Sequence, residues 1–438
     1  MATKSSRADV GVLGAGIMGS CLALELAKRG CRVDLFDLAS VPMTGASLHN
    51  EGKLHLGFVY ANDPLRQTHG LMLRGSLAFS RIIKMLTGCG AESLSPSRPF
   101  HYFVPVDSQL DMAAIENHFH EVEAAAREET RNSGDLYLDR RIDRYYERTS
   151  SGEHSGMFSS RLTLGSFRTE ERSVSTIAVA DILRGAMKDQ PNINFIANTK
   201  ILAACRLAGG EVEIESCKDG EAAVNRYPCA ANCLWDDKLR IDRTAGIRDQ
   251  GPWLLRYKAM VNISAPSAAR GNIPSATGIL GAYGDVVNHN DGSYYISWYP
   301  LCKLAQSTNE EGRKLHDKVH KWFLPRRIRK MAAGYPSIAG FITSITHKKF
   351  IEDNVRERAA YIPSLAALLN SGGHCKLGGG VILARGTTDI DDPKSYLHQR
   401  SMIGPSAYGS YITIDTGKYC TAPLFAMEAA DMVAKIVR

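Results

Sequence analysis

The sequence contains no apolar run of the length needed to cross a membrane, and no repetitive or compositionally biased tract. A membrane-spanning helix needs about 18 or more consecutive apolar residues. The first nine residues are largely polar and lead directly into a predicted strand, so there is no room for the apolar core of a signal peptide. We therefore expect a cytoplasmic protein without a membrane span.

Several common catalytic patterns are also missing. The ten cysteines form no CxxC pair, and no Walker loop, Ser-His-Asp order or quartet of metal ligands is evident. We expect free, mostly buried thiols in a reducing compartment and no metal site. The chemistry would then have to come from a bound organic cofactor.

Charge gives little evidence for a nucleic-acid partner. The chain has 438 residues, 44% of them hydrophobic and 23% charged, and its net charge of +7 is spread along the sequence. The densest basic stretch, FLPRRIRKMAAG (residues 323–334), lacks interleaved aromatic residues and is typical of a solvated helix face. A chain of this length can form two cores or one composite fold.

The N-terminal region has the order strand, glycine-rich turn, helix, strand. An apolar run at residues 10–13 leads into GAGIMG (residues 14–19), an apolar helix ends before Gly30, and the alternating segment 32–37 ends in Asp37. This order is typical of a Rossmann dinucleotide-binding unit, whose helix N-terminus binds phosphates. The predicted cofactor-binding residues here are Gly14, Ala15, Gly16, Ile17, Met18, Gly19, Asp37 and Leu38.

Each residue type in this unit has a physical role. Gly14 permits a tight turn, Gly16 lets the backbone approach a pyrophosphate, and Gly19 lets the helix pack closely on the strand. Asp37 follows Gly19 by 18 residues, about where a carboxylate receives a ribose hydroxyl and disfavours a 2′-phosphate. The alternative for Asp37 is a solvated acid at a strand end.

The segment after the second strand decides between dinucleotides. TGASLHNEGKLHLGFVYANDP (residues 44–64) is a long polar segment without helical periodicity, which is unusual unless it surrounds a ligand. It resembles the second flavin-binding segment of the D-amino-acid-oxidase-like superfamily, closest to the branch with L-2-hydroxyglutarate and glycerol-3-phosphate dehydrogenases. The shared pattern is Ser-x-x-Asn-x-Gly-x-x-His-x-Gly, with Ser47, Asn50, Gly52, His55 and Gly57 in this chain.

The resemblance implies an α/β composite fold: a Rossmann-type FAD-binding domain with a discontinuous antiparallel-sheet substrate domain. Four later segments also resemble the family's sequence, and they begin at Phe167, Asn194, Ala230 and Tyr411. In the segment that begins at Ala230, Cys233 and Leu234 replace the usual small residues. The flavin contacts implied by the resemblance are Ser47, His49, Asn50, Glu51, Gly52, Ile201, Asn232, Gly417, Lys418 and Tyr419. A covalent flavin link through His49 is an alternative that we do not favour.

Lys418 stands between a glycine turn and a predicted helix. A cation and a helix N-terminus at this place would stabilise the negative charge of reduced flavin. The alternative is a surface lysine that caps the turn.

The candidate catalytic residues are His55, Lys53, Lys258 and Arg385. His55 could accept a substrate proton or hydrogen-bond its own loop. Arg385 could anchor a substrate anion or pair with a nearby aspartate, with Arg400 as a weaker alternative. Lys53 and Lys258 could promote reaction with oxygen or be solvated strand residues.

The aromatic strand GSYYISWYP (residues 292–300) could form one wall of a pocket over the flavin. Packing in the core of an antiparallel sheet is the simpler interpretation for most of its residues.

Both domains are expected to be discontinuous. The FAD-binding domain would comprise residues 1–95, 165–245 and 373–438, and the substrate domain 96–164 and 246–372. A helical insertion at about 301–372 resembles nothing in the family and could cover the site or contact a partner.

We therefore predict an FAD-dependent oxidoreductase that oxidises a CH–NH or CH–OH bond of a small, anionic substrate such as an amino acid or amine. A 2-hydroxy acid or polyol phosphate is the alternative substrate, and oxygen or another acceptor would reoxidise the flavin. An NAD-linked dehydrogenase and an RNA-associated flavin module are more remote alternatives.

Overall fold

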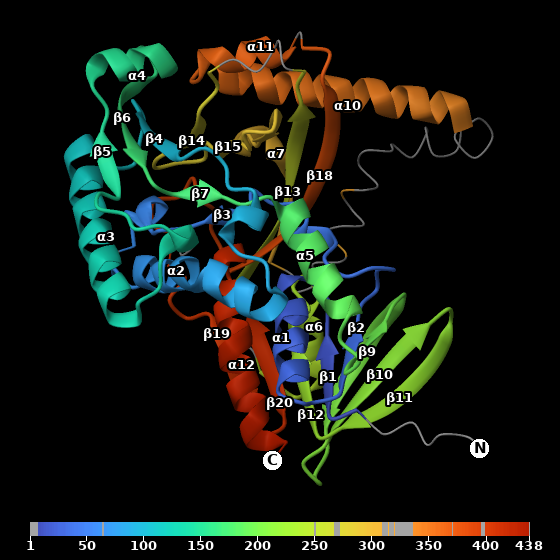
Figure 1. Ribbon diagram of the computed structural model, residues 1–438. Coiled ribbons are helices and arrows are strands. Elements are labelled where there is room, and N and C mark those ends of the chain that lie inside the picture. The colour runs from blue at the N-terminus through green and yellow to red at the C-terminus, as the bar shows by residue number, and fades with distance from the viewer. Residues whose placement is uncertain are drawn as a thin grey trace.

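The computed structural model describes residues 8–63, 65–248, 251–266, 272–308, 314, 319, 336–369, 371–395 and 399–437, without the side chains of 336–346. Two large sheets organise these residues, one at each end of the molecule in Figure 1. Segments distant in sequence combine in each sheet, so the fold is of the mixed α/β type expected.

The six-stranded sheet contains the glycine-rich turn. Its order is β19 (Gly404–Tyr408), β20 (Tyr411–Asp415), β12 (Cys229–Asn232), β1 (Val10–Leu13), β2 (Val33–Phe36) and β8 (Ile193–Ile196). All neighbours are parallel except β19 and β20. Strands β1 and β12 at the centre of this sheet are short and fully buried, which explains why their sequences are largely apolar.

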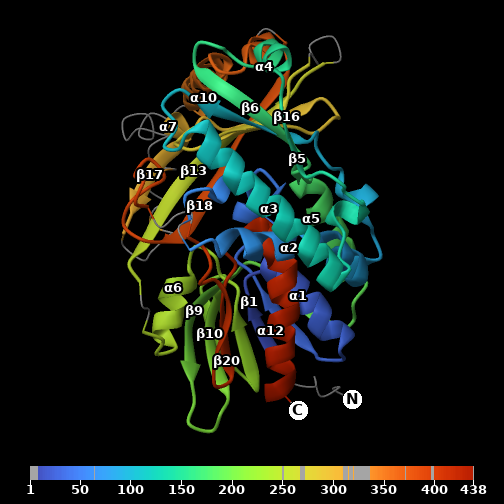
Figure 2. The same ribbon diagram turned by 90° about the vertical axis from the view of Figure 1, so that its left-hand side faces the viewer.

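Helices cover one face of this sheet and a small sheet lies near its other side. Helix α1 (Ile17–Lys28) is buried on almost every side, because it packs against α5 (Thr176–Lys188) and α12 (Ala422–Ile436) as well as the sheet. Figure 2 shows α1 and α12 side by side in front of β1. The small antiparallel sheet contains β9 (Thr199–Arg206), β10 (Val212–Lys218) and β11 (Glu221–Tyr227), with α6 (Lys238–Thr244) packed on β9.

The nine-stranded sheet forms the other half. Its order is β17 (Lys303–Ser307), β13 (Trp253–Ser264), β16 (Ser293–Ile296), β15 (Asp285–Asn288), β14 (Ser275–Gly278), β4 (Phe100–Pro105), β6 (Thr163–Thr169) and β5 (Tyr146–Arg148), with β18 (His374–Arg385) paired to β13. The sheet is antiparallel apart from the β4–β14 pair. β3 (Lys53–Leu54) and β7 (Arg172–Ser173) form a separate antiparallel pair.

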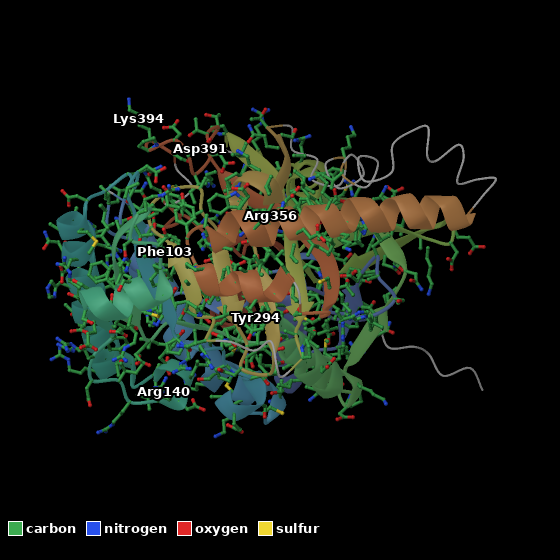
Figure 3. All side chains as sticks on the ribbon, turned by 90° about the horizontal axis from the view of Figure 1, so that it is seen from above. Phe103, Arg140, Tyr294, Arg356, Asp391 and Lys394 are labelled. Carbon is green, nitrogen blue, oxygen red and sulfur yellow. The ribbon has the colours of Figure 1, made fainter. Side chains whose placement is uncertain are left out.

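The remaining helices lie over both halves. They are α2 (Thr68–Thr87), α3 (Met112–Ser133), α4 (Ser151–Met157), α7 (Tyr299–Cys302), α10 (Pro336–Ala359) and α11 (Ala366–Leu369). Helix α10 crosses above the nine-stranded sheet in the view of Figure 3, and the core that it shares with the sheet includes Phe103, Tyr294 and Val355. No helix in the described ranges is long and apolar enough to cross a membrane.

The strand pairing bears on where the two domains meet. We expected 373–438 to belong to the FAD-binding domain, but β18 pairs with β13 along its whole length inside the nine-stranded sheet. Strand β6 likewise pairs with β4 in that sheet, although most of it lies after the expected boundary at residue 165. We therefore propose boundaries after β6 and after β18.

The expected helical insertion at 301–372 is partly described. α10 and α11 are helical, whereas β17 lies in the large sheet at the start of the segment. The basic stretch 323–334 lies outside the described residues.

Candidate active site

A cavity of about 470 Å³ begins at the carboxyl ends of β1 and β2 and continues toward the nine-stranded sheet. This volume lies within the usual range for small-molecule sites, and the ends of parallel strands are where α/β folds bind ligands. Its lining combines glycines of the first turn, the polar segment after β2, and residues of β9, β13, β16 and β18.

The glycine turn leaves no room for side chains. Gly14 has a φ of 96°, which favours glycine. A Cβ on Gly19 would lie 1.8 Å from the carbonyl oxygen of Gly14, and one on Gly16 would lie 2.8 Å from Oγ of Ser47. The backbone at the start of α1 is therefore bare, as close approach of a pyrophosphate requires.

Asp37 follows directly after β2 and lines the same end of the cavity. Its Oδ2 accepts the backbone N–H of Ala15 at 2.7 Å, and its Oδ1 accepts that of Ala39 at 2.8 Å. Burial raises the pKa of the carboxyl group, while these hydrogen bonds oppose the rise. The side chain is thus held at the place expected for a ribose contact.

Hydrogen bonds fix the polar segment after β2 against the glycine turn. The backbone N–H of Ile17 donates to Oγ of Ser47 at 2.9 Å, which ties the segment to the start of α1. Asn50 donates to the carbonyls of Ala46 and Ser47 and accepts the N–H of Gly52. A Cβ on Gly52 would lie 2.1 Å from the carbonyl oxygen of Val174, so this turn requires glycine.

The buried Lys53 and the largely buried Lys258 meet one carboxylate at the end of the cavity nearest the large sheet. Nζ of Lys53 lies 3.2 Å from Oδ1 of Asp285, and Nζ of Lys258 lies 3.9 Å from its Oδ2. Burial disfavours the charge of Lys258, but Tyr295, Glu51 and Asp285 raise its pKa above the usual range. Lys53 also lies 3.4 Å from Oε1 of the buried Glu171. Both cations are therefore held in place by acids.

His55 lies beside this cluster. Its Nδ1 is 4.0 Å from Oε1 of Glu171 and has no hydrogen-bond partner in the described part of the chain. Burial, together with the charges of Lys418 and Lys53, holds the pKa of His55 well below its usual value. The imidazole is thus neutral at physiological pH.

Lys418 and Arg400 add positive charge to the same wall. Burial and the charge of Arg400 lower the pKa of Lys418 to about 8, although Glu51 opposes this change. Nη1 of Arg400 donates to the carbonyl of Gly417 at 2.8 Å, which holds the guanidinium beside Lys418. The hydroxyl of Tyr295 on β16 lies 3.5 Å from Oε2 of Glu51.

The cavity brings together most of the residues predicted from sequence. Those lining it are Gly14, Gly16, Ile17, Met18, Asp37, Leu38, Ser47, His49, Asn50, Glu51, Lys53, His55, Ile201, Lys258, Gly417, Lys418 and Tyr419. Ala15, Gly19, Gly52, Asn232 and Arg385 are not among the lining residues. Ala15, Gly19 and Gly52 contribute through the backbone interactions and close packing given above.

Asn232 and Arg385 have other surroundings. Asn232 is fully buried and donates to the carbonyl of Lys238 and to Asp242, which ties β12 to α6. The guanidinium carbon of Arg385 lies 4.9 Å from the ring centre of Trp253. Asp389, an aspartate near Arg385 in sequence, pairs with Arg256 at 2.8 Å. Contact between Arg385 and a substrate therefore stays a prediction.

The cavity also contains residues that sequence reasoning missed. Gly379 and Gly380 of β18 line it, and a Cβ on Gly380 would lie 3.1 Å from Cα of Ala46. Three consecutive glycines inside a strand are the signal that could have revealed this close approach. Trp235 lines the cavity and donates its indole N–H to the carbonyl of Val381 at 2.6 Å.

The sequence pattern of the family described as DAO, FAD dependent oxidoreductase, matches residues 9–234, just over half of the chain. The chain belongs to this family. It is thus an FAD-dependent oxidoreductase, and this favours FAD over the NAD-linked alternative. No curated protein sequence matches the chain.

Solved structures show the same DAO-family fold at low sequence identity. Glycine oxidase from Geobacillus kaustophilus is 13% identical with a TM-score of 0.63, covering 98% of this chain and 95% of its own. L-Amino acid deaminase from Proteus myxofaciens, in complex with anthranilate, is 14% identical with a TM-score of 0.62, covering 99% and 92%. L-α-Glycerophosphate oxidase from Mycoplasma pneumoniae, with FAD bound, is 13% identical with a TM-score of 0.60, covering 98% and 95%.

The cavity of this DAO-family enzyme fits an extended dinucleotide. The bare backbone at Gly14 and Gly16 suits the pyrophosphate, Asp37 suits the ribose, and the segment at Ser47 borders the path toward Lys258. When bound, FAD supplies the hydride acceptor of the reaction.

Proposed function

We propose that this flavoenzyme oxidises a CH–NH or CH–OH bond of a small anionic substrate by hydride transfer to flavin N5, with an amino acid or amine as the preferred class. The observation that carries the proposal is the continuity of one cavity from the Asp37 end to a wall containing Lys258, Arg400 and Lys418. Cations in a buried wall stabilise a bound anion more than cations in bulk water do.

The chain's own residues divide the work in this proposal. Lys418 and Arg400 bind the anionic group of the substrate, and the charge of Lys418 would also stabilise negative charge on a bound flavin. Lys258 stays charged because Tyr295, Glu51 and Asp285 raise its pKa against the effect of burial. His55, being neutral, offers a hydrogen bond to the reacting nitrogen or oxygen, and its lowered pKa argues against a role as a strong base.

Anaerobic bleaching of the purified yellow protein tests the proposal. Amino acids, N-methyl amines, 2-hydroxy acids and polyol phosphates are added separately, and the flavin absorbance is followed. We expect bleaching by one class and return of colour when oxygen or another acceptor is admitted. Protein that carries flavin and is bleached by none of these classes would refute the proposed reaction.

The alternative that we do not favour, a covalent link through His49, can be tested separately. His49 lines the cavity beside β18, where its Nδ1 lies 2.8 Å from the position that a Cβ on Gly378 would take. Because the covalent link is not favoured, we expect acid precipitation to release all of the flavin into the supernatant. The link would be established if the yellow colour stayed in the pellet of the wild type but passed into the supernatant of His49→Asn.

A further inference from the structure

Most charges at the substrate end of the cavity already have partners. Asp285 lies within 4 Å of both Lys53 and Lys258, and its own carboxylate accepts the hydroxyl of Thr277 at 2.6 Å. Glu171 adds a second acid beside Lys53 and also accepts the backbone N–H of Leu56 at 2.6 Å. These buried groups neutralise one another within the protein.

Glu51 differs from these acids. It lines the cavity, it makes no ion pair within 4.0 Å among the described residues, and its one close polar contact there is the hydroxyl of Tyr295 at 3.5 Å. Its backbone is fixed on both sides, because Asn50 bonds back to Ala46 and forward to the N–H of Gly52. The loop therefore presents the carboxylate of Glu51 to the cavity.

The other acids that line the cavity are Asp37, Asp236 and Asp237, in the segments that follow β2 and β12. Asp37 accepts two backbone N–H groups, and Oδ2 of Asp237 pairs with Arg240 at 2.6 Å. Arg240 in turn donates to the carbonyls of Ile201 and Leu202 on β9. Glu51 instead lies close enough to Lys258 and Lys418 to raise the pKa of both.

Lys418 provides the matching positive charge. It lines the same cavity, and none of the ion pairs within 4.0 Å in the described chain involves it. Glu51 raises the pKa of Lys418 and also that of Lys258. It nevertheless forms no ion pair within 4.0 Å with either lysine. A carboxylate and an ammonium that both line the cavity match the two charges of a zwitterion.

We propose that Glu51 is a specificity-determining residue that binds the substrate ammonium, so that the enzyme selects amino acids over the corresponding 2-hydroxy acids. The inference rests on the proposed function and deepens it. A hydroxyl in place of the ammonium would leave Glu51 without a cation in direct contact, which removes one charge-assisted hydrogen bond. Lys418 would bind the carboxylate common to both classes.

Matched pairs of ligands test this assignment. Perturbation of the flavin spectrum is titrated anaerobically with glycine and glycolate, L-alanine and L-lactate, D-alanine and D-lactate, and glutamate and 2-hydroxyglutarate. The wild type should bind the amino acid of at least one pair about ten- to a hundredfold more tightly than its hydroxy partner. Glu51→Gln should lose this preference by weakening the amino acid alone, and Glu51→Asp should restore part of it.

Lys418→Met is the matched control variant. It should weaken both members of a pair by a similar factor, because both carry the carboxylate. Equal weakening of both members by Glu51→Gln, a wild-type preference for the hydroxy acid, or no response to any pair would overturn the role of Glu51. The proposed function fails on a different result, the absence of bleaching by every class in the wider screen, which includes amines and polyol phosphates.

Discussion

Protonation of His118 should make this protein sensitive to mild acid. His118 lies on α3 with no exposed surface, and its Nε2 is 3.1 Å from the carbonyl oxygen of Gly57. Its Nδ1 is 2.8 Å from Nη1 of Arg66, so the neutral ring donates to Gly57 and accepts from the guanidinium. A proton on Nδ1 would place a donor and a positive charge against Arg66.

The magnitude follows from the pKa of this group. Burial, together with nearby charges, lowers the pKa of His118 to about 4 in the folded protein, against a usual value of 6.5. Because the unfolded chain takes up the proton first, stability present above about pH 6.5 is lost as the pH falls toward 4. At pH 5 this one residue lowers the free energy of unfolding by about 2 kcal/mol. That is a sizeable part of the roughly 5–15 kcal/mol by which a typical folded protein is stable.

The test compares urea unfolding of the holoenzyme at pH 7.5 and pH 5.0, followed by circular dichroism and flavin fluorescence. His118→Gln should be about 1 kcal/mol less stable than the wild type at pH 7.5, because a buried hydrogen bond is lost. It should then lose about 2 kcal/mol less than the wild type on going to pH 5.0. His120→Gln, an exposed position on the same helix, is the control. If the wild type and His118→Gln lose equal stability between the two pH values, the reasoning is wrong.

Three further predictions concern the cavity. Gly19→Ala should purify with little flavin because its Cβ would lie 1.8 Å from Gly14 O, whereas Gly185→Ala on α5, with nothing within 4 Å, should keep full flavin absorbance. In the wild type, kcat/KM should fall as the pH rises through about 8, because Lys418 loses its charge there. Lys418→Met should lack this fall. Identical pH profiles of the two proteins would contradict the role of Lys418 in substrate binding. Asp285→Asn should lower the free energy of unfolding by about 3–5 kcal/mol, because Lys53 and Lys258 lose their shared acid. Thr277→Val, which removes only a hydrogen bond to Asp285, should lower it by about 1–2 kcal/mol. Equal losses of the two variants in urea unfolding would show that charge is not the cause.

Short-range sequence patterns were sufficient to predict the dinucleotide-binding unit. The glycine spacing, the apolar helix and the acid at the end of the second strand are all set within residues 10–37, and the structure forms β1, α1 and β2 there. The closing strand and helix were also predictable, since residues 411–415 alternate and 422–436 have helical periodicity. The segment with Ser47 and Asn50 could be predicted to lie at the cofactor because all residues of its Ser-x-x-Asn-x-Gly-x-x-His-x-Gly pattern fall within one short stretch.

Contacts between distant segments could not be predicted in this way. Lys53 and Asp285 are 232 residues apart, and only the packing of β3 against the large sheet shows that they share a buried ion pair. Arg385 is the last residue of β18 and Arg400 precedes β19, yet Arg385 packs on Trp253 and Arg400 lines the cavity.

The sequence by itself determined the class of cofactor, because the groups that bind a dinucleotide are largely backbone atoms whose geometry depends on local glycine positions. The tertiary structure decided which charges at the other end of the cavity are neutralised and which remain available. Neutralisation depends on distances between side chains from β3, β13 and β15, and the order of residues along the chain does not contain those distances.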